Sequence, residues 1–210
     1  LDRGLRVLAN PDREQQGWMK VVTQNDPTKR TRAAEEYLEE FSEGIHAPMA
    51  HALLSIAYAE AQNPGPATRH GEAALAMLPT MMPPLEYDPA SWPMLRDGLL
   101  VDAYYGAGTA YLFRAFGGES QHVSKAMAYL TRATEMSPRD ERSHLRLGFA
   151  HEVLMKNLEE ALLEYARAAA ANGPNSLKAR QHLEQVYQRL YGSNKGMEKL
   201  ISDQKKILGG

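Results

Sequence analysis

One spacing recurs along this chain of 210 residues and limits its fold more than any other feature. A small residue is followed by a ring side chain three positions later, then by two alanines seven positions apart, and then by a proline. Once insertions in the turns are removed, successive ring positions lie about 34 residues apart, a period typical of helical repeats. The three copies are Ser55, Tyr58, Ala67, Ala74 and Pro79, then Gly108, Tyr111, Ala126, Ala133 and Pro138, and then Gly148, His151, Ala161, Ala168 and Pro174.

Two antiparallel helices explain this order of residues. The small residue of the first helix and the alanines of the second let the helices approach closely, and the proline ends the second helix. A single pair cannot bury its apolar face, so pairs stack on one another. No segment shows the sustained two-residue alternation of a strand. The sequence therefore predicts an all-α fold built as a right-handed superhelical stack of about five antiparallel helix pairs.

Proline and glycine turn signals divide the chain into these pairs. Asp26 and Pro27, for example, predict a helix start with Asp26 as its N-cap. A proline-rich insertion at 79–97 contains Trp92. It either packs between two helix pairs or folds into the groove of the stack. We expect an N-terminal extension at 1–10 and a single domain at 11–208. Within this domain we expect a divergent pair at 11–45, a repeat at 48–79, the insertion at 79–97, repeats at 98–138 and 140–174, and a decayed capping pair at 176–208.

Charge and composition exclude several classes of function. A net charge of −2 argues against a nucleic-acid partner, and the absence of cysteine excludes disulfides, a cysteine nucleophile and thiolate metal sites. No apolar run reaches the length of a transmembrane segment. His144 and His151 stand two helical turns apart, too far to hold one metal ion. We therefore predict a protein without cofactor or metal that is not an enzyme.

The 34-residue pattern resembles the tetratricopeptide repeat family over residues 48–208, and its best copy is 141–174. The resemblance implies a concave groove, lined by the first helix of each pair, in which a peptide or a partner protein lies. Residues 25–41 also look like the divergent helix pairs of some bacterial envelope repeat proteins, which favours export over the cytoplasm. The alternative function is then an oligomeric accessory subunit of a transport or secretion system, with a small ligand. The sequence leaves the oligomeric state, the partner and a removed leader or lipid anchor open.

The stacking pattern also predicts which residues line the groove. Its N-terminal end is apolar, with Met49 and Ile56 on the concave face, and its C-terminal end is basic. Arginine forks bind carboxylates at two points, so an acidic part of the ligand would meet the basic end. The other interpretation is that these charges only form a solvated helix face. The predicted partner-binding residues are Tyr105, Thr109, Arg142, Leu145, Arg146, Phe149, Lys178 and His182.

Overall fold

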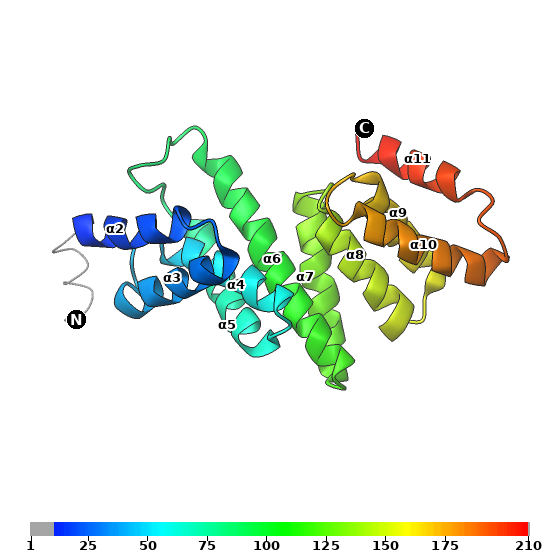
Figure 1. The fold of residues 1–210 in the computed structure, drawn as a ribbon, viewed down its shortest axis with the longest axis horizontal. Helices are drawn as coiled ribbons and strands as arrows, with labels where there is room; N and C mark the ends of the chain where they lie inside the picture. Colours follow the sequence, from blue (N-terminus) through cyan, green and yellow to red (C-terminus); the bar gives the residue numbers. More distant parts are fainter. Residues whose placement is uncertain (1–10, 210) are drawn as a thin grey trace. The chain divides into compact units, whose positions relative to one another are not determined.

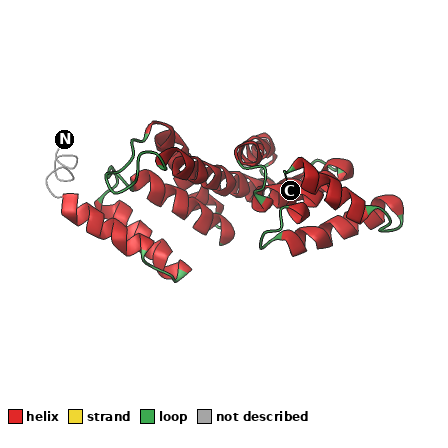
Figure 2. Ribbon diagram, turned by 90° about the horizontal axis from the view of Figure 1, so that it is seen from above, coloured by secondary structure: helices red, strands yellow, loops and turns green. Residues whose placement is uncertain are grey.

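The computed structural model describes residues 11–209, and this range contains ten α-helices and no strand (Figure 2). The predicted all-α class is therefore confirmed. The extension expected at 1–10 lies outside the described residues. Within residues 11–209, no helix combines the length and the apolarity that crossing a bilayer requires.

The chain divides into two compact units, the first ending at Ala110 and the second beginning at Tyr111, inside a long helix. The prediction of one superhelical stack stays a prediction, and each unit is described by itself (Figure 1). The first unit holds α2 (Pro11–Val22), α3 (Pro27–Glu40), α4 (Ala47–Glu60), α5 (Pro64–Met77), a 3₁₀ turn (Leu78–Thr80) and most of α6 (Trp92–Phe116). The second holds the end of α6, a 3₁₀ turn (Ser120–His122), α7 (Val123–Met136), α8 (Glu141–Phe149), a π-helical turn (Ala150–Leu154), α9 (Leu158–Ala170), α10 (Ser176–Tyr191) and α11 (Met197–Ile207).

Local sequence signals set the helix ends in the first unit. Asp26 caps α3 by accepting a hydrogen bond from the backbone N–H of Lys29 at 2.8 Å, as its position before Pro27 predicts. The next helix has Pro48 in its first turn, where its missing N–H has no helical partner to lose. Helix α6 begins at Trp92, inside the insertion predicted at 79–97, because the first turn of a helix also tolerates Pro93.

Small residues let the helices of the first unit approach closely. A Cβ atom on Gly106 would lie 2.8 Å from the backbone carbon of Ser55, and one on Gly71 would lie 2.7 Å from the Cβ atom of Ala107. These distances are shorter than real carbon contacts, so only glycine fits without a backbone shift. The Ser55 hydroxyl also donates a hydrogen bond to the carbonyl of Ala67 in α5 at 3.1 Å, so the close approach predicted within this helix pair is confirmed. Large side chains fill the adjacent core, among them Trp18, Tyr37, Phe41, Leu54 and Trp92.

The second unit uses the same device between α8 and α9. A Cβ atom on Gly148 would lie within 3.0 Å of three atoms of the Tyr165 ring. Four alanines of the repeat are fully buried, as their spacing predicts: Ala126, Ala133, Ala161 and Ala168. The sequence did not predict the π-helical turn that continues α8. There the Tyr165 hydroxyl donates a hydrogen bond to Glu152 at 2.8 Å.

Candidate functional site

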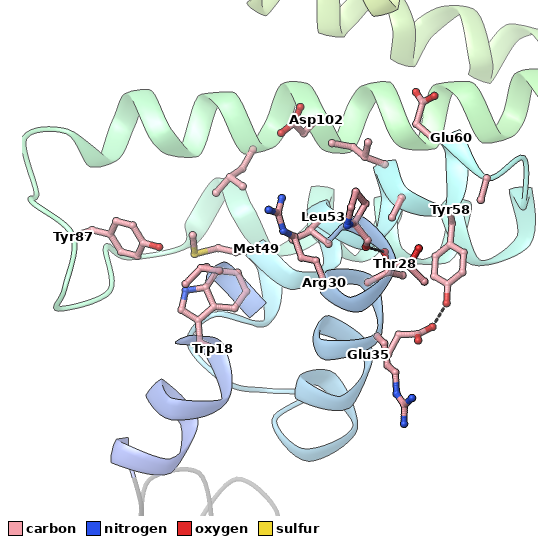
Figure 3. A pocket seen from close by; sticks show the side chains of 18 residues that line it. Trp18, Thr28, Arg30, Glu35, Met49, Leu53, Tyr58, Glu60, Tyr87 and Asp102 are labelled. Carbon is pink, nitrogen blue, oxygen red and sulfur yellow. Dashed lines mark hydrogen bonds between the residues drawn. The ribbon is translucent and has the colours of Figure 1, made fainter. Parts of the chain in front are cut away.

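A cavity of about 940 Å³ opens in the first unit and is the candidate binding site (Figure 3). Its walls come from α2, the first half of α3, α4, the loop before α6, and α6 itself. Aliphatic side chains cover much of the surface, namely Leu53, Ile56, Ala57 and Leu99. A lining of this kind suits the apolar side chains of a ligand.

Two aromatic rings and a methionine form one end of the cavity. Trp18 comes from α2, Met49 from α4 and Tyr87 from the loop, and Figure 3 shows the three side chains near one another. Tyr87 in turn packs on the buried ring of Trp92, with the ring centroids 5.8 Å apart. The proline-rich insertion therefore both packs into the core and contributes one wall of the cavity.

Arg30 extends from α3 into the cavity (Figure 3). Its Nε donates a hydrogen bond to the backbone carbonyl of Gln24 at 2.7 Å, which leaves the two terminal nitrogens directed at the open space. The other cation in the lining, Arg32, pairs with Glu36 at 2.9 Å. No carboxylate within residues 13–209 pairs with Arg30.

The acidic side chains around the cavity already have partners in the chain. Glu35 accepts a hydrogen bond from the Tyr58 hydroxyl, and Glu60 accepts one from the Tyr105 hydroxyl. These contacts fix the carboxylates against α4 and α6. The cavity is thus an apolar groove with one cationic fork available to a ligand and with acids that are held in place.

A histidine pair packs on the other side of α4, between that helix and α5. The Nδ1 atoms of His51 and His70 lie 2.8 Å apart, so one ring donates its proton to the other. Burial, with the neighbouring His51 and Arg69, lowers the pKa of His70 to about 4. The pKa of His51 is also lowered, mainly by burial. Both rings are therefore neutral at pH 7 and act as a packing contact.

The sequence-predicted binding residues of the first unit are buried. Tyr105 is 2% exposed and uses its hydroxyl on Glu60, and Thr109 is fully buried. The structure assigns both side chains to the interior. On the predicted concave face of α4, Met49 and Ile56 do line the cavity, whereas Ala52 is fully buried.

In the second unit the structure brings together three of the predicted residues. The ring of His182 lies 4.5 Å from that of Phe149, and Lys178 places its ammonium 5.9 Å from the same Phe149 ring. Burial lowers the pKa of His182, so this ring is neutral at pH 7 and is not the cation that the sequence suggested.

The remaining predicted residues of the second unit contact other groups. Arg142 pairs with Asp140 at 2.8 Å, and Arg146 lies 5.3 Å from the centre of the Phe113 ring. Leu145 belongs to the buried core. The side chains predicted to form the basic end of the groove therefore make several separate contacts within the chain.

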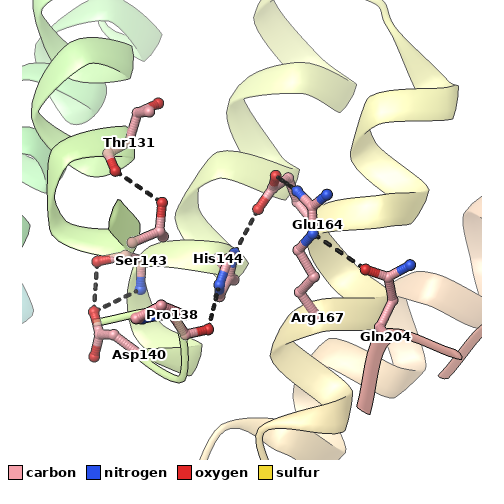
Figure 4. A network of polar contacts seen from close by, with 9 residues as sticks. Thr131, Pro138, Asp140, Ser143, His144, Glu164, Arg167 and Gln204 are labelled. Carbon is pink, nitrogen blue, oxygen red and sulfur yellow. Dashed lines mark hydrogen bonds and ion pairs between the residues drawn. The ribbon is translucent and has the colours of Figure 1, made fainter. Parts of the chain in front are cut away.

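A buried polar network joins three helices of the second unit (Figure 4). His144 Nδ1 lies 2.6 Å from Glu164 Oε2, and its Nε2 lies 3.0 Å from the carbonyl oxygen of Pro138. His144 of α8 thus bridges Glu164 of α9 and the backbone of the turn at Pro138. Arg167 pairs with Glu164 and also donates to Gln204 of α11. The network clamps helices together and holds no nucleophile.

Comparison with known proteins adds no assignment to this geometry. No protein-family model, no curated protein and no solved structure matches the chain. Within the part of the chain that the structure describes, no group of three or more histidine or acidic side chains is arranged to hold a metal ion.

Sequence reasoning missed the residues that give the cavity its chemistry, above all Trp18, Arg30 and Tyr87. They lie in the divergent first pair and in the insertion, where the repeat pattern gives no positions. The one available signal was the apolar character of the proline-rich insertion, which is unusual for a solvated loop.

Proposed function

We propose that this protein is a non-enzymatic interaction scaffold of the tetratricopeptide-repeat type, and that the cavity of its first unit binds an extended segment of a partner protein. The cavity volume suits a few side chains of a peptide. Helices α4 and α6, which the resemblance makes the first helices of successive pairs, contribute to the lining together with α2 and α3.

The observation that carries the proposal is the position of Arg30. A guanidinium beside apolar surface loses hydration, and pairing with a carboxylate restores that loss with two parallel hydrogen bonds. The chain supplies no such carboxylate within its described residues. The proposed ligand therefore carries a large apolar side chain for the end formed by Trp18 and Tyr87, and an aspartate or glutamate that meets Arg30.

A peptide library tests this chemistry directly. Peptides of about nine residues that vary one apolar and one acidic position are screened against the wild-type protein, and the tightest peptide is then made with glutamine in place of its glutamate. We expect Arg30→Gln to weaken the acidic peptide about 10-fold or more, because it removes a charge-assisted hydrogen bond. The glutamine peptide should bind both proteins with similar affinity.

The matched control is Lys29→Gln. Lys29 is an exposed neighbour with the same charge, and it does not line the cavity. If Lys29→Gln weakens the acidic peptide as much as Arg30→Gln does, the effect is one of net charge and the assigned site is wrong. The proposal also fails if the glutamate and glutamine peptides bind the wild-type protein equally well.

A further inference from the structure

Two of the carboxylates that line the cavity lie at the same end of it. Figure 3 shows Glu35 of α3 and Glu60 of α4 at the end away from the aromatic rings of Trp18 and Tyr87. The guanidinium of Arg30 lies between these two ends (Figure 3). The cavity therefore has three chemically different parts in a fixed order, namely an aromatic end, a central cation and an acidic end.

A tyrosine hydroxyl positions each carboxylate of the acidic end. Tyr58 donates a hydrogen bond to Oε1 of Glu35, and Tyr105 donates one to Oε1 of Glu60. A carboxylate has about four lone-pair sites, so one bond from a neutral hydroxyl fixes its position and leaves its charge and most of its accepting capacity in place. Among the described residues, no cation pairs with Glu35 and no donor contacts its Oε2 atom. This carboxylate is thus held ready for a donor that comes from outside the chain.

Small apolar side chains line the cavity next to these acids. Ala57 belongs to the last turn of α4, and Ala61 directly follows the end of that helix, beside Tyr58 and Glu60 in the sequence. Lysine and arginine carry three or four methylene groups below the charged head, and these groups pack on apolar surface while the head reaches a polar partner. The acidic end therefore offers both surfaces that a long basic side chain needs.

We infer that the acidic end binds a lysine or arginine of the ligand, so that the bound segment carries a large apolar residue, then an acidic residue and then a basic residue along the cavity. The methylene groups of the basic side chain lie on Ala57 and Ala61, and its charged head meets Glu35 and Glu60. This inference rests on the proposed function, because it adds a third contact to the same ligand.

The order of the three parts also fixes the direction in which the ligand lies. A segment with its acidic and basic residues exchanged would bring a cation to Arg30 and an anion to Glu35 while its apolar residue fills the aromatic end. Both of these contacts join like charges, which repel one another. The cavity therefore distinguishes two peptides of the same composition and the same net charge.

A lysine scan of the tightest library peptide tests this inference by isothermal titration calorimetry. Lysine is placed in turn at each position on the far side of the acidic residue from the apolar one, and each peptide is compared with its glutamine version. At the best position the wild-type protein should bind the lysine peptide about fivefold more tightly, as a partly exposed ion pair allows. Exchanging the acid and the lysine should weaken binding below that of the glutamine peptide. Glu35→Gln keeps the hydrogen bond from Tyr58 but should reduce the lysine advantage to less than about twofold, because the charge is lost.

The matched control is Glu39→Gln, which removes the same charge one turn further along α3 at an exposed residue that does not line the cavity. This variant should keep the full lysine advantage. The inference is overturned if the wild type binds the lysine and glutamine peptides equally at every position, if Glu35→Gln keeps the advantage, or if Glu39→Gln loses it too. The proposed function survives those results as long as Arg30→Gln still weakens the acidic peptide. If no library peptide binds the wild-type protein, the proposed function fails and the inference fails with it.

Discussion

Each of the two units contains a buried histidine that bridges separate elements, but the two bridges end on different kinds of structure. In the second unit, His144 is held by Glu164 of helix α9 and by the carbonyl of Pro138, and Arg167 neutralises the same carboxylate (Figure 4). In the first unit, His46 is held on one side by the buried Glu14 and on the other by Glu86, a partly exposed side chain of a loop.

The two histidine–glutamate contacts therefore differ in the exposure of the carboxylate, which is buried at Glu164 and 30% exposed at Glu86. Breaking the contact of His144 with Glu164 requires two packed helices to separate, so it belongs to global unfolding. The contact of His46 with Glu86 joins a helix start to a loop, in which Pro84 is fully buried and Tyr87 packs on Trp92.

The largest expected effect comes from removing the shared carboxylate of the second unit. Glu164→Ala removes the common partner of the buried His144 and of Arg167, whose side chain is about one third exposed, so the free energy of unfolding should fall by about 3 kcal/mol. Urea denaturation followed by circular dichroism measures this change. The corresponding variant of the first unit, Glu86→Ala, should cost only about 1 kcal/mol, because His46 keeps Glu14 and the loop side chain was partly hydrated.

Equal losses in the two variants would mean that the greater exposure of Glu86 does not reduce its contribution to stability. An exposed acid of the same helix, Glu159, provides the control for a change of charge alone. Replacing it by alanine should alter stability by less than about 1 kcal/mol, which is the range of a helix-end charge.

An intermediate effect is expected where glycines permit close helix contacts, and here the units should behave alike. Gly106→Ala in the first unit and Gly148→Ala in the second each place a Cβ atom too close to backbone or ring atoms, and each should cost about 1–3 kcal/mol. A Cβ atom on Gly98 of α6 would instead point into open space, so Gly98→Ala should stabilise by up to about 1 kcal/mol through helix propensity. Thermal denaturation separates these signs. A neutral Gly148→Ala would mean that Tyr165 can move aside.

A pH dependence is also expected from the histidine pair of the first unit. Because the pKa of His70 is about 4 in the folded protein and about 6.5 when unfolded, the unfolded state binds more protons between these values. The contribution of His70 to stability is thus complete above about pH 6.5 and is lost as the pH falls toward about 4. His70→Phe keeps the ring stacked on Tyr58 and removes the titration. The free energy of unfolding of the wild type should therefore fall, relative to this variant, across that range. If the free energies of unfolding of the wild type and of His70→Phe change with pH in the same way, the lowered pKa of His70 is wrong.

The sequence predicted the framework well because the framework follows local rules. Capping residues and prolines predicted where α3 and α4 begin. The repeat offsets predicted the buried alanines and the close helix contacts at Ser55 and Gly148. Each of these features depends on helical period and steric size, both of which can be read from one chain.

The binding site could not be predicted in the same way. The repeat pattern placed the basic end of the groove at Arg142 and Arg146, but it could not show that a neighbouring aspartate and a phenylalanine ring engage these side chains. The chemistry of the cavity depends instead on Arg30 and Tyr87, which reach it from the divergent pair and from a loop. The position of a loop side chain is decided by tertiary packing, which leaves no period in the sequence.

The most direct test of the account is a nuclear magnetic resonance titration of the protein with the tightest acidic library peptide. Trp18 is one of only two tryptophans, so its indole resonance is simple to assign, and it reports on the aromatic end of the cavity. We predict that this resonance and the methyl groups of Leu53 and Ile56 shift on binding, and that Arg30→Gln requires about tenfold more peptide to reach the same shifts. Shifts that gather instead around Arg146 and Lys178 would place the binding site in the second unit and contradict the account.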